Sequence, residues 1–162
     1  TFAPRQIRYI RIEQADSDPY YWWSIHEVYV SSRGELTVSA SHNDVHTGPD
    51  NLLQAIDGNV YTRWSTQEPQ KPGMWFAIDL GQLQHVSYLK LDNDRSPKDY
   101  PRGYVVKVSP DGQRWETVAE KAVNDSSLAV SFASRLVRYL RIEQTGSDDF
   151  YWWSIHGVQV KE

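Results

Sequence analysis

Apolar and polar residues alternate with a period of two through most of the chain, which is the pattern of β-strands with one buried face. The clearest case is residues 75–80, where Phe76, Ile78 and Leu80 fall on one face. The same pattern predicts further strands over residues 35–41, 86–91, 104–109, 114–119, 128–132, 137–143 and 155–160. Only residues 50–56 resemble a helical turn. Many short strands with turn residues between them indicate an all-β sandwich or barrel.

Two turns between these segments carry distinctive residues. Pro-Asp-Gly at 110–112 separates two predicted strands and is a strong hairpin signal. Asp-Gly-Asn at 57–59 predicts a tight turn, because Gly accepts a positive φ and Asn tolerates it. With Thr62 this turn gathers side-chain oxygens around one point, which suits a hard cation such as calcium with ~6–8 oxygen ligands. Arg63 and Trp64 follow Thr62 directly. Arg63 offers a fork of hydrogen-bond donors, and Trp64 offers a large apolar ring.

The two ends of the chain repeat each other. Residues 8–30 align without a gap with residues 138–160, at a constant offset of 138 − 8 = 130. The simplest account is a tandem array with a unit of that length, which is a plausible domain size. Residues 1–33 would then be an N-terminal β-hairpin and linker, the tail of an upstream repeat or a swapped strand pair, and residues 34–162 a complete module.

Two nearly identical hairpins are expected to compete for one place in the sandwich. The short polar linker SSRG, at 31–34, would let the N-terminal copy reach the same edge as the C-terminal one. The hairpin that loses would stack on the outside or pair with another chain, giving strand-swapped self-association. The alternative is that residues 1–33 are a truncated remnant.

The composition limits the classes of partner and the chemistry that are expected for this chain. The net charge of −4 argues against nucleic acid and against attraction to an anionic membrane. The chain has no Cys, so neither a disulfide nor thiol chemistry is available. No run is apolar and long enough to span a membrane, and no signal peptide is visible. Seven Trp and ten Tyr are more than a core of this size needs, so some rings are expected at a binding surface.

Five stretches carry a family resemblance. Between about residues 35 and 160 the chain contains, in order, AIDGNVYTRW, WFAIDLG, SPKDYPRGYVVKVSPDGQRWETV, RYLRIEQ and WWSIHGVQV. Together they resemble the discoidin domain, also called the coagulation-factor type C domain, and most of all its bacterial branch, carbohydrate-binding module family 32. The resemblance implies an antiparallel β-sandwich with jelly-roll topology, similar to galactose-binding domains. It also implies a structural calcium and a ligand site on loops at one end.

The resemblance assigns a calcium site. Its ligands would be the carbonyls of Gln54 and His156 and the side chains of Asp57, Asn59 and Thr62. A carboxylate should follow His156, but position 157 is Gly, and the carboxylate stands instead in the N-terminal copy, as Glu27. Three outcomes stay open: weaker calcium, water in the gap, or Glu27 supplied by the N-terminal hairpin.

The resemblance also assigns a sugar site, formed by His42, Asn43, His46, Arg63, Glu68, Asp94, Phe150 and Tyr151. The chemistry suits a sugar, because a guanidinium donates in a fork, a carboxylate accepts from two hydroxyls, and a ring stacks on a C–H face. The alternatives are a structural ion pair for Arg63, a solvated loop for Glu68, and core positions for Phe150 and Tyr151.

Other chemistry is not expected. His42 and His46 have metal-ligand spacing only on a helix, and the flanking Gly48 and Pro49 place them in a loop, so zinc is not predicted. Glu68 and Asp94 could be tried as an acid/base pair for glycoside hydrolysis, but nothing in the sequence ties them to that role. The chain has no nucleophile elbow, phosphate loop or HExxH motif, so no enzymatic activity is expected. Of the Trp22–Trp23 and Trp152–Trp153 pairs, at least one ring each should be core, because neighbours on a strand face opposite ways.

The prediction is therefore a non-catalytic carbohydrate-binding module of a secreted bacterial polysaccharide-active enzyme. Its partners would be an oligo- or polysaccharide and the tethered catalytic domain, with avidity from repetition. Acidic side chains at the rim (Glu68, Asp92 and Asp94) would tolerate neutral or amino sugars and repel uronic acids. The alternatives are a discoidin-type adhesion module for phospholipid or protein, and a structural spacer.

Overall fold

The computed structural model describes residues 11–16, 19–20, 22–23, 36–42 and 50–162. Contacts along the chain divide it into two compact units, Thr1–Ser32 and Arg33–Glu162. None of the described helices has the length and apolar character needed to cross a membrane.

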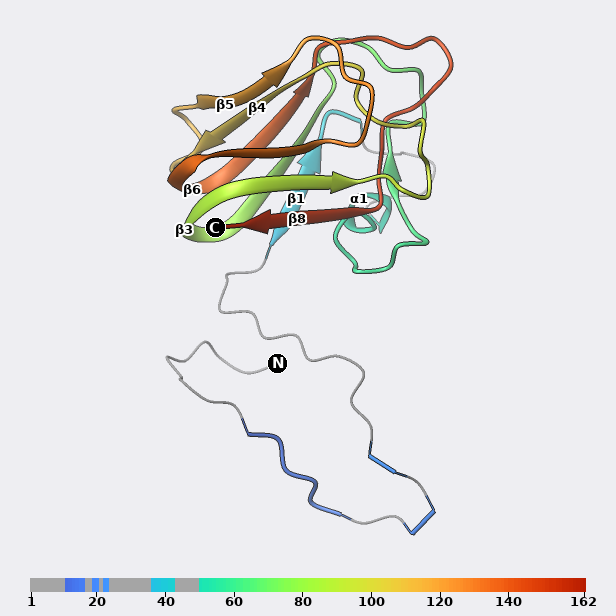
Figure 1. The fold of residues 1–162 in the computed structure, drawn as a ribbon, viewed down its shortest axis with the longest axis vertical. Coiled ribbons are helices and arrows are strands. Elements are labelled where there is room, and N and C mark those ends of the chain that lie inside the picture. Colours follow the sequence, from blue (N-terminus) through green and yellow to red (C-terminus); the bar gives the residue numbers. More distant parts are fainter. Residues whose placement is uncertain (1–10, 17–18, 21, 24–35, 43–49) are drawn as a thin grey trace. The chain divides into compact units, whose positions relative to one another are not determined.

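The second unit is a β-sandwich (Figure 1). Its elements are β1 (Thr37–Ala40), α1 (Asp50–Leu53), β2 (Trp64–Ser65), β3 (Trp75–Asp92), β4 (Tyr104–Ser109), β5 (Glu116–Lys121), β6 (Ala129–Gln144), β7 (Ser154–Ile155) and β8 (Gly157–Lys161). The main sheet has the order β1-β3-β6-β4-β5, β8 pairs with the second half of β3, and β2 pairs with β7. All these pairs are antiparallel. The predicted fold class is confirmed.

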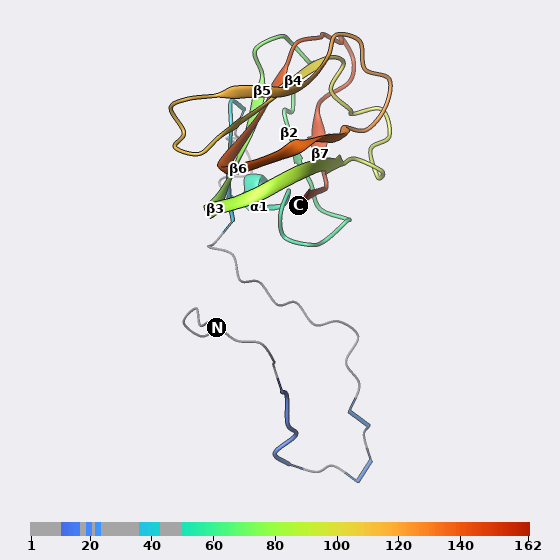
Figure 2. The ribbon, with the colours of Figure 1, turned by 60° about the vertical axis from the view of Figure 1, so that its left-hand side comes forward.

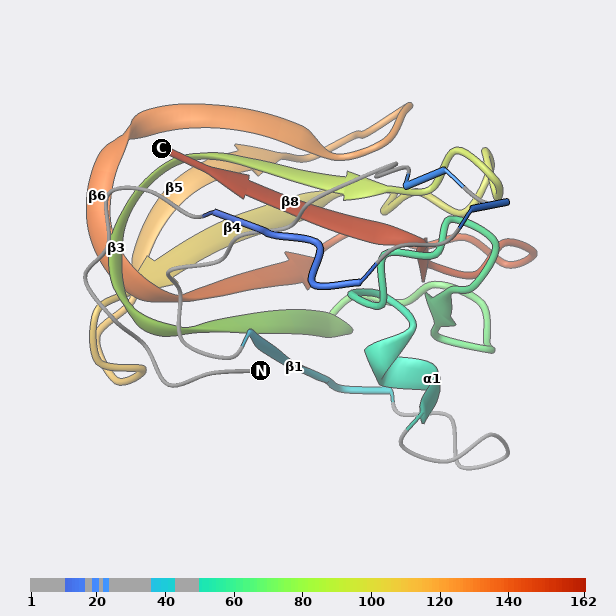
Figure 3. The same ribbon diagram turned by 90° about the horizontal axis from the view of Figure 1, so that it is seen from below.

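Strands β3 and β6 serve both layers of the sandwich. They run side by side and curve together around one end of the unit (Figures 2 and 3). Their register shifts between Asp79 and Gln84, where Gly81 has φ = 74° and the Asp79 carboxylate accepts a hydrogen bond of 2.8 Å from the Gly81 amide. A glycine in this conformation lets the strand bend, and pairing with β6 resumes at Gln84 after the interruption.

This bend explains why two pairs of predicted strands are in fact two single long strands. The segments predicted at 75–80 and 86–91 are one strand, β3, and those at 128–132 and 137–143 are one strand, β6. The strand predicted at 155–160 is divided at His156, the predicted helical turn ends at Leu53, and the strand predicted at 114–119 is β5.

The core lies between the two layers. The predicted inward face of β3 is confirmed, since Phe76, Ile78 and Leu80 are all at most 1% exposed. Two buried indoles occupy its centre, with Trp64 and Trp153 edge-to-face at 5.5 Å between ring centroids. Such pairing adds roughly 0.5–1.5 kcal/mol beyond burial. Trp64 belongs to β2 and Trp153 directly precedes β7. This buried pair therefore fixes the loops at one end of the sandwich.

Most of the predicted N-terminal hairpin lies outside the described residues. Its described part, including residues 11–16, forms no regular strand, and Ile12 and Trp23 are more than half exposed. The hairpin and the domain boundary at 33/34 stay predictions.

Candidate functional site

Arg63 lies at the loop end of the sandwich, directly before β2. Its Nη1 donates to the Ser96 hydroxyl at 2.6 Å and lies 3.3 Å from an Asp99 carboxylate oxygen. Asp99 is itself fixed, because it accepts from the Ser154 hydroxyl at 2.7 Å. The Arg63 side chain stays 37% exposed, and its guanidinium carbon lies 6.0 Å from the Trp152 ring. The structure therefore shows the ion pair that was one alternative for Arg63, and because the side chain is partly exposed, its role as a ligand contact stays a prediction.

The imidazole of His156 supports Arg63 through Ser96. His156 Nδ1 lies 3.1 Å from the Val60 carbonyl oxygen, and Nε2 lies 3.0 Å from Ser96 Oγ. A carbonyl only accepts, so Nδ1 carries the proton and Nε2 accepts from the Ser96 hydroxyl. The hydroxyl oxygen is then left to accept from Arg63. The ring is buried, so this chain of hydrogen bonds connects the core to the exposed guanidinium.

Glu68 and His42, both predicted site residues, lie together. Glu68 Oε1 is 2.7 Å from His42 Nε2, and Oε2 accepts from Lys71 Nζ at 3.1 Å. The hydrogen bond from Lys71 is the main reason that the pKa of the Glu68 carboxyl lies below its ordinary value. The Glu68 side chain is 37% exposed, so it is open to a ligand from solvent.

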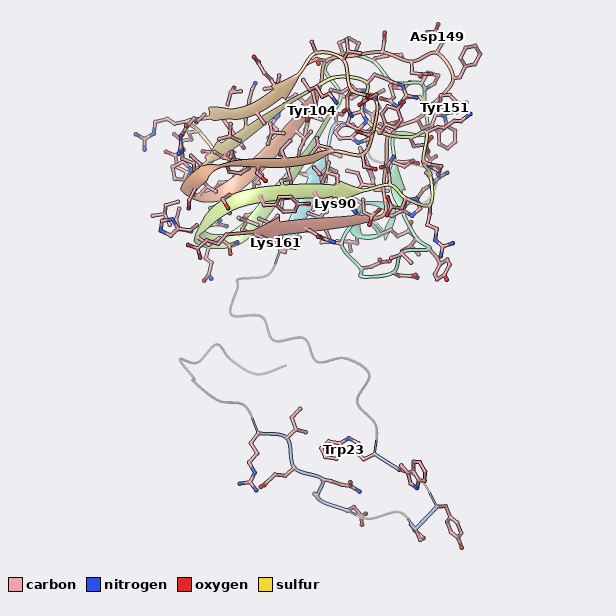
Figure 4. All side chains as sticks on the ribbon, in the orientation of Figure 1. Trp23, Lys90, Tyr104, Asp149, Tyr151 and Lys161 are labelled. Carbon is pink, nitrogen blue, oxygen red and sulfur yellow. The ribbon has the colours of Figure 1, made fainter. Side chains whose placement is uncertain are left out.

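The loop from β6 to β7 carries the aromatic part of the site. Tyr151 projects from this loop (Figure 4), and its hydroxyl accepts from Lys98 at 3.1 Å. Phe150, beside it, is 85% exposed, so the core alternative is excluded for Phe150. Trp153 is buried and Trp152 is 36% exposed, which confirms that one ring of the pair belongs to the core.

The Asp148 carboxylate holds this aromatic loop in place. It accepts from the backbone amides of Phe150 and Tyr151 at 2.8 and 2.9 Å and pairs with Arg102 Nε at 2.7 Å. Burial raises the pKa of Asp148, but these amide and guanidinium donors outweigh burial, and the pKa lies below its ordinary value. Arg102 is therefore tied to a carboxylate of this loop.

Asp94, another predicted ligand residue, has contacts with Lys90 and Asp92 and not with the side chains described above. It is 3.9 Å from Lys90 Nζ, and its amide donates to the Asp92 carboxylate at 2.9 Å. Next to it, the Arg95 guanidinium lies 4.5 Å from the ring of Tyr61, which is 75% exposed. The other two predicted ligand residues, Asn43 and His46, fall outside the described residues.

Sequence reasoning missed Ser96, Lys71 and Lys98. Serine and lysine in polar loops give no pattern that marks a site. Lys71 reaches Glu68 three residues away, whereas Ser96 and Lys98 reach their partners only through the fold. The Ser96 contact spans 60 residues to His156, and the Lys98 contact spans 53 to Tyr151.

The predicted calcium loop is closed by its own hydrogen bonds. Asp57 accepts from the Asn59 amide at 2.8 Å and from the Thr62 hydroxyl at 2.6 Å. The oxygen types suit calcium, but Asp57 is the only carboxylate among them, and affinity rises with the number of charged ligands. The described residues contain no cluster of three or more His, Cys, Asp or Glu side chains. The donor types of the loop fit calcium, Glu27 lies outside the described residues, and the calcium site with its three open outcomes stays a prediction.

Position 157, where the carboxylate was expected, has room for a Cβ. A Cβ added at Gly157 would lie 3.6 Å from the Asp92 Cβ, which is ordinary contact, and no positive φ strains this position. Gly157 pairs with Asp92 across β8 and β3. The absence of a carboxylate here is therefore a property of the sequence and not of crowding.

A hollow of about 520 Å³ lies elsewhere, on the outer face of the main sheet. It is lined by Trp75, Trp115, Tyr139 and Arg141 among others, and by none of the predicted ligand residues. Arg141 covers the Trp75 ring at 4.5 Å. The predicted site is thus an open rim of half-exposed side chains.

A model of the F5/8 type C domain family matches residues 37–158. The chain belongs to this family. No curated protein matches it. The match spans the sandwich from β1 into β8, so the five motifs were a correct guide to the family.

Several solved structures resemble this F5/8 type C domain. Chitosan-binding module 1 of a chitosanase/glucanase from Paenibacillus sp. IK-5 is 28% identical, with a TM-score of 0.66, over 78% of this chain and 94% of that one. Module 2 of the same enzyme, solved with chitotriose, is 26% identical, with a TM-score of 0.65, over 78% and 95%. The family 32 module of AlyQ, solved with 4,5-unsaturated mannuronic acid, is 25% identical, with a TM-score of 0.59, over 80% and 98%. These relatives are carbohydrate-binding modules, which are non-catalytic, and this supports carbohydrate binding.

Proposed function

We propose that the second unit is a non-catalytic module that binds amino-sugar oligosaccharides of the chitosan type on its loop rim. The observation that carries this proposal is the half-exposed Glu68 carboxylate, held by His42 and Lys71 on the loop that follows β2, with Arg63 directly before that strand. An ammonium group of a glucosamine residue has three donors for such a carboxylate. The Lys71 pair is exposed, and such pairs stabilise by only about 0–1 kcal/mol, so an ammonium can replace Lys71 at little cost.

The other rim side chains complete the proposed site. The Arg63 fork would donate to ring hydroxyls, and Tyr151 would stack on a C–H face. The loop of Glu68 and the aromatic loop are tied together, since the Gln70 amide donates to the Tyr151 carbonyl at 3.3 Å and its side-chain amide donates to the Trp152 carbonyl at 2.7 Å. A ligand on this rim would contact both loops at once.

Charge decides between amino sugars and the lipid alternative. Phe150 is an exposed apolar tip, as a lipid-binding loop requires, but Asp149 precedes it, Asp148 is already paired with Arg102, and the chain carries a net charge of −4. An acidic surround repels anionic phospholipid. The same acidity favours a cationic polymer, so the sugar proposal accounts for the rim better.

We further propose a role for this sugar binding in a larger protein. The module would hold a tethered, secreted polysaccharide-active enzyme on its substrate, with affinity per module increased by repetition. The Asp57–Thr62 loop would hold calcium weakly, with the carbonyls of Gln54 and His156 as further ligands.

A binding panel tests the proposal. The full chain is titrated with chitotriose, fully N-acetylated chitotriose, galactose, an oligomannuronate and anionic vesicles. The proposal expects binding to chitotriose that weakens at least tenfold on N-acetylation, and no vesicle binding. Tight binding to oligomannuronate, or equal binding of both chitin-type sugars, would contradict it.

A further inference from the structure

The hollow on the outer face of the main sheet has the size of a ligand site. Its volume is about 520 Å³, and ligand sites typically have volumes of roughly 300–1,000 Å³. Three aromatic rings line it, namely Trp75 in β3, Tyr139 in β6 and Trp115 directly before β5. No described residue of the rim lines it, so the hollow is not part of the rim.

Short side chains in the middle of the sheet create the hollow. Ala77 lies opposite Ser39 on β1 and opposite Arg141 on β6. Trp75 precedes Ala77 by two residues, so its ring is on the same face of the sheet. Tyr139 precedes Arg141 by two residues on the antiparallel neighbour and shares that face. The floor therefore consists of Ser39 and Ala77, with a ring at each end.

The turn between β4 and β5 forms a fixed wall beside Tyr139. Gly112 has φ = 74°, and a Cβ added there would lie 3.4 Å from the Tyr139 ring, so the turn lies against this ring. The Asp111 carboxylate accepts from two backbone amides of the turn, both at 2.9 Å. Trp115, at the end of the turn, is 37% exposed. A ring on a fixed turn loses little freedom when a ligand binds.

The charges in the hollow are already compensated. Among the described residues that line it, the three charged side chains each have a partner of opposite charge. The pairs are Asp79 with Arg138 at 2.7 Å, Asp111 with Arg114 at 2.9 Å and Arg141 with Glu143 at 3.0 Å. A charged ligand of either sign therefore gains no net attraction here, and an uncharged one leaves the pairs intact.

Flat rings, small hydroxyls and compensated charges suit a neutral sugar chain. We propose that the hollow is a second carbohydrate site, which takes uncharged sugar rings of an oligo- or polysaccharide. The C–H faces of the sugars would stack on Trp75, Tyr139 and Trp115. Their hydroxyls would meet the Ser39 hydroxyl and the Arg141 guanidinium, which has five N–H donors and so keeps its ion pair. This site does not rest on the rim site, because the two share no described residue.

The geometry favours a glycan over a peptide. The hollow extends along β3 from Trp75 to Asp79, four residues or roughly 13 Å, which is longer than one sugar ring. Along this length β3 is paired with β1 on one side and with β6 on the other. Its backbone is therefore closed to an added peptide strand, and the face offers side chains only.

Filling the floor of the hollow tests the proposal in the full chain. Calorimetry measures the binding of three neutral hexasaccharides, cellohexaose, mannohexaose and xylohexaose, and the wild type should bind at least one of them. Ala77→Leu occupies the floor and should weaken this binding roughly tenfold or more. It should leave chitotriose binding unchanged, and Arg63→Ala should leave hexasaccharide binding unchanged, so the failure of one site is distinguishable from the failure of the other.

Two further variants complete the test. Ala133→Leu makes the same exchange at an exposed position of β6 outside the hollow, and it should bind the hexasaccharide as the wild type does. Trp115→Ala removes one of the rings without touching the core and should weaken binding, which covers the case in which Ala77→Leu does not fold. The Tm of Trp115→Ala should stay within about 2 °C of wild type.

Four results would overturn the proposal. The first is a wild type that binds none of the three hexasaccharides. The second is equal affinity in Ala77→Leu and Ala133→Leu. The third is loss of hexasaccharide binding in Arg63→Ala, which would place these sugars on the rim. The fourth is self-association in sedimentation experiments that Ala77→Leu abolishes, which would show that the hollow is a protein interface.

Discussion

Ser96 Oγ and His156 Nε2 lie 3.0 Å apart, and this pairing aligns the exposed Arg63 from within the core. His156 was expected to act only through its carbonyl, as a calcium ligand. The structure gives its ring a separate role, because the tautomer fixed by the Val60 carbonyl makes Ser96 donate to His156 and accept from Arg63. The geometry of the rim therefore depends on a buried imidazole.

Replacing Ser96 tests this relationship. Ser96→Ala removes the acceptor of Arg63 and leaves His156 Nε2 without its donor. We expect affinity for chitotriose to fall roughly five- to tenfold, about 1–1.4 kcal/mol, with a small loss of Tm. Ser96→Thr keeps the hydroxyl and should retain affinity.

Ser134→Ala is the matched control for Ser96→Ala. Ser134 contacts His85 Nδ1 at 3.3 Å, so it is also a serine–histidine pair, but an exposed one. It should bind as wild type does. Equal affinities for Ser96→Ala and Ser134→Ala would contradict the role of Ser96.

Glu68→Gln should separate cationic from neutral sugars. The substitution keeps the shape and removes the charge, so affinity for chitotriose should fall roughly tenfold while any galactose binding is unchanged. Because the pKa of Glu68 is lowered, wild-type binding should persist as pH falls to the ordinary carboxyl range and weaken below it. Calorimetry with both sugars measures this, and an equal loss for both would argue against an ammonium partner.

Calcium should matter little until the missing carboxylate is restored. We expect the wild-type Tm to change by less than about 2 °C between a chelator and millimolar calcium. Gly157→Glu has room for its Cβ and should make Tm rise clearly with calcium. A wild-type Tm that falls sharply with the chelator would show that the loop binds calcium well without a carboxylate at 157.

The Asp79–Arg138 pair should make stability depend on acid. Arg138 donates to both Asp79 oxygens, at 2.7 and 2.8 Å, and this lowers the Asp79 pKa from its ordinary value of 3.8. The stabilisation is therefore complete above pH 3.8 and is lost as pH falls below it through the folded-state pKa. Asp79→Asn should cost roughly 1 kcal/mol at neutral pH and should show a weaker fall of Tm between pH 4 and 2. Parallel Tm curves for the two proteins would contradict this.

The sequence predicted the fold better than the strand boundaries. Alternation identified the inward face of β3, but Gly81 looked like the end of a strand, because nothing local distinguishes a bend from a stop. Strand alternation also could not choose between Trp152 and Trp153, since the choice depends on where β7 begins. Those features are decided by tertiary contacts.

The candidate site was predictable only where a motif marked it. Arg63 follows the turn motif, and Glu68 and His42 came from the resemblance; the structure brings Glu68 and His42 together. Ser96 and Lys98 come from a loop without periodicity, and their roles follow from contacts across more than 50 residues.

Calorimetric titration of chitotriose into the wild type, Arg63→Ala and Arg135→Ala tests the central claim most directly. Arg135 pairs with Glu116 near the bend of β6 and serves as the matched control. The account predicts binding to the wild type and to Arg135→Ala alike, and an affinity at least tenfold weaker, about 1.4 kcal/mol, for Arg63→Ala. Unchanged affinity in Arg63→Ala, or no binding to the wild type, would contradict it.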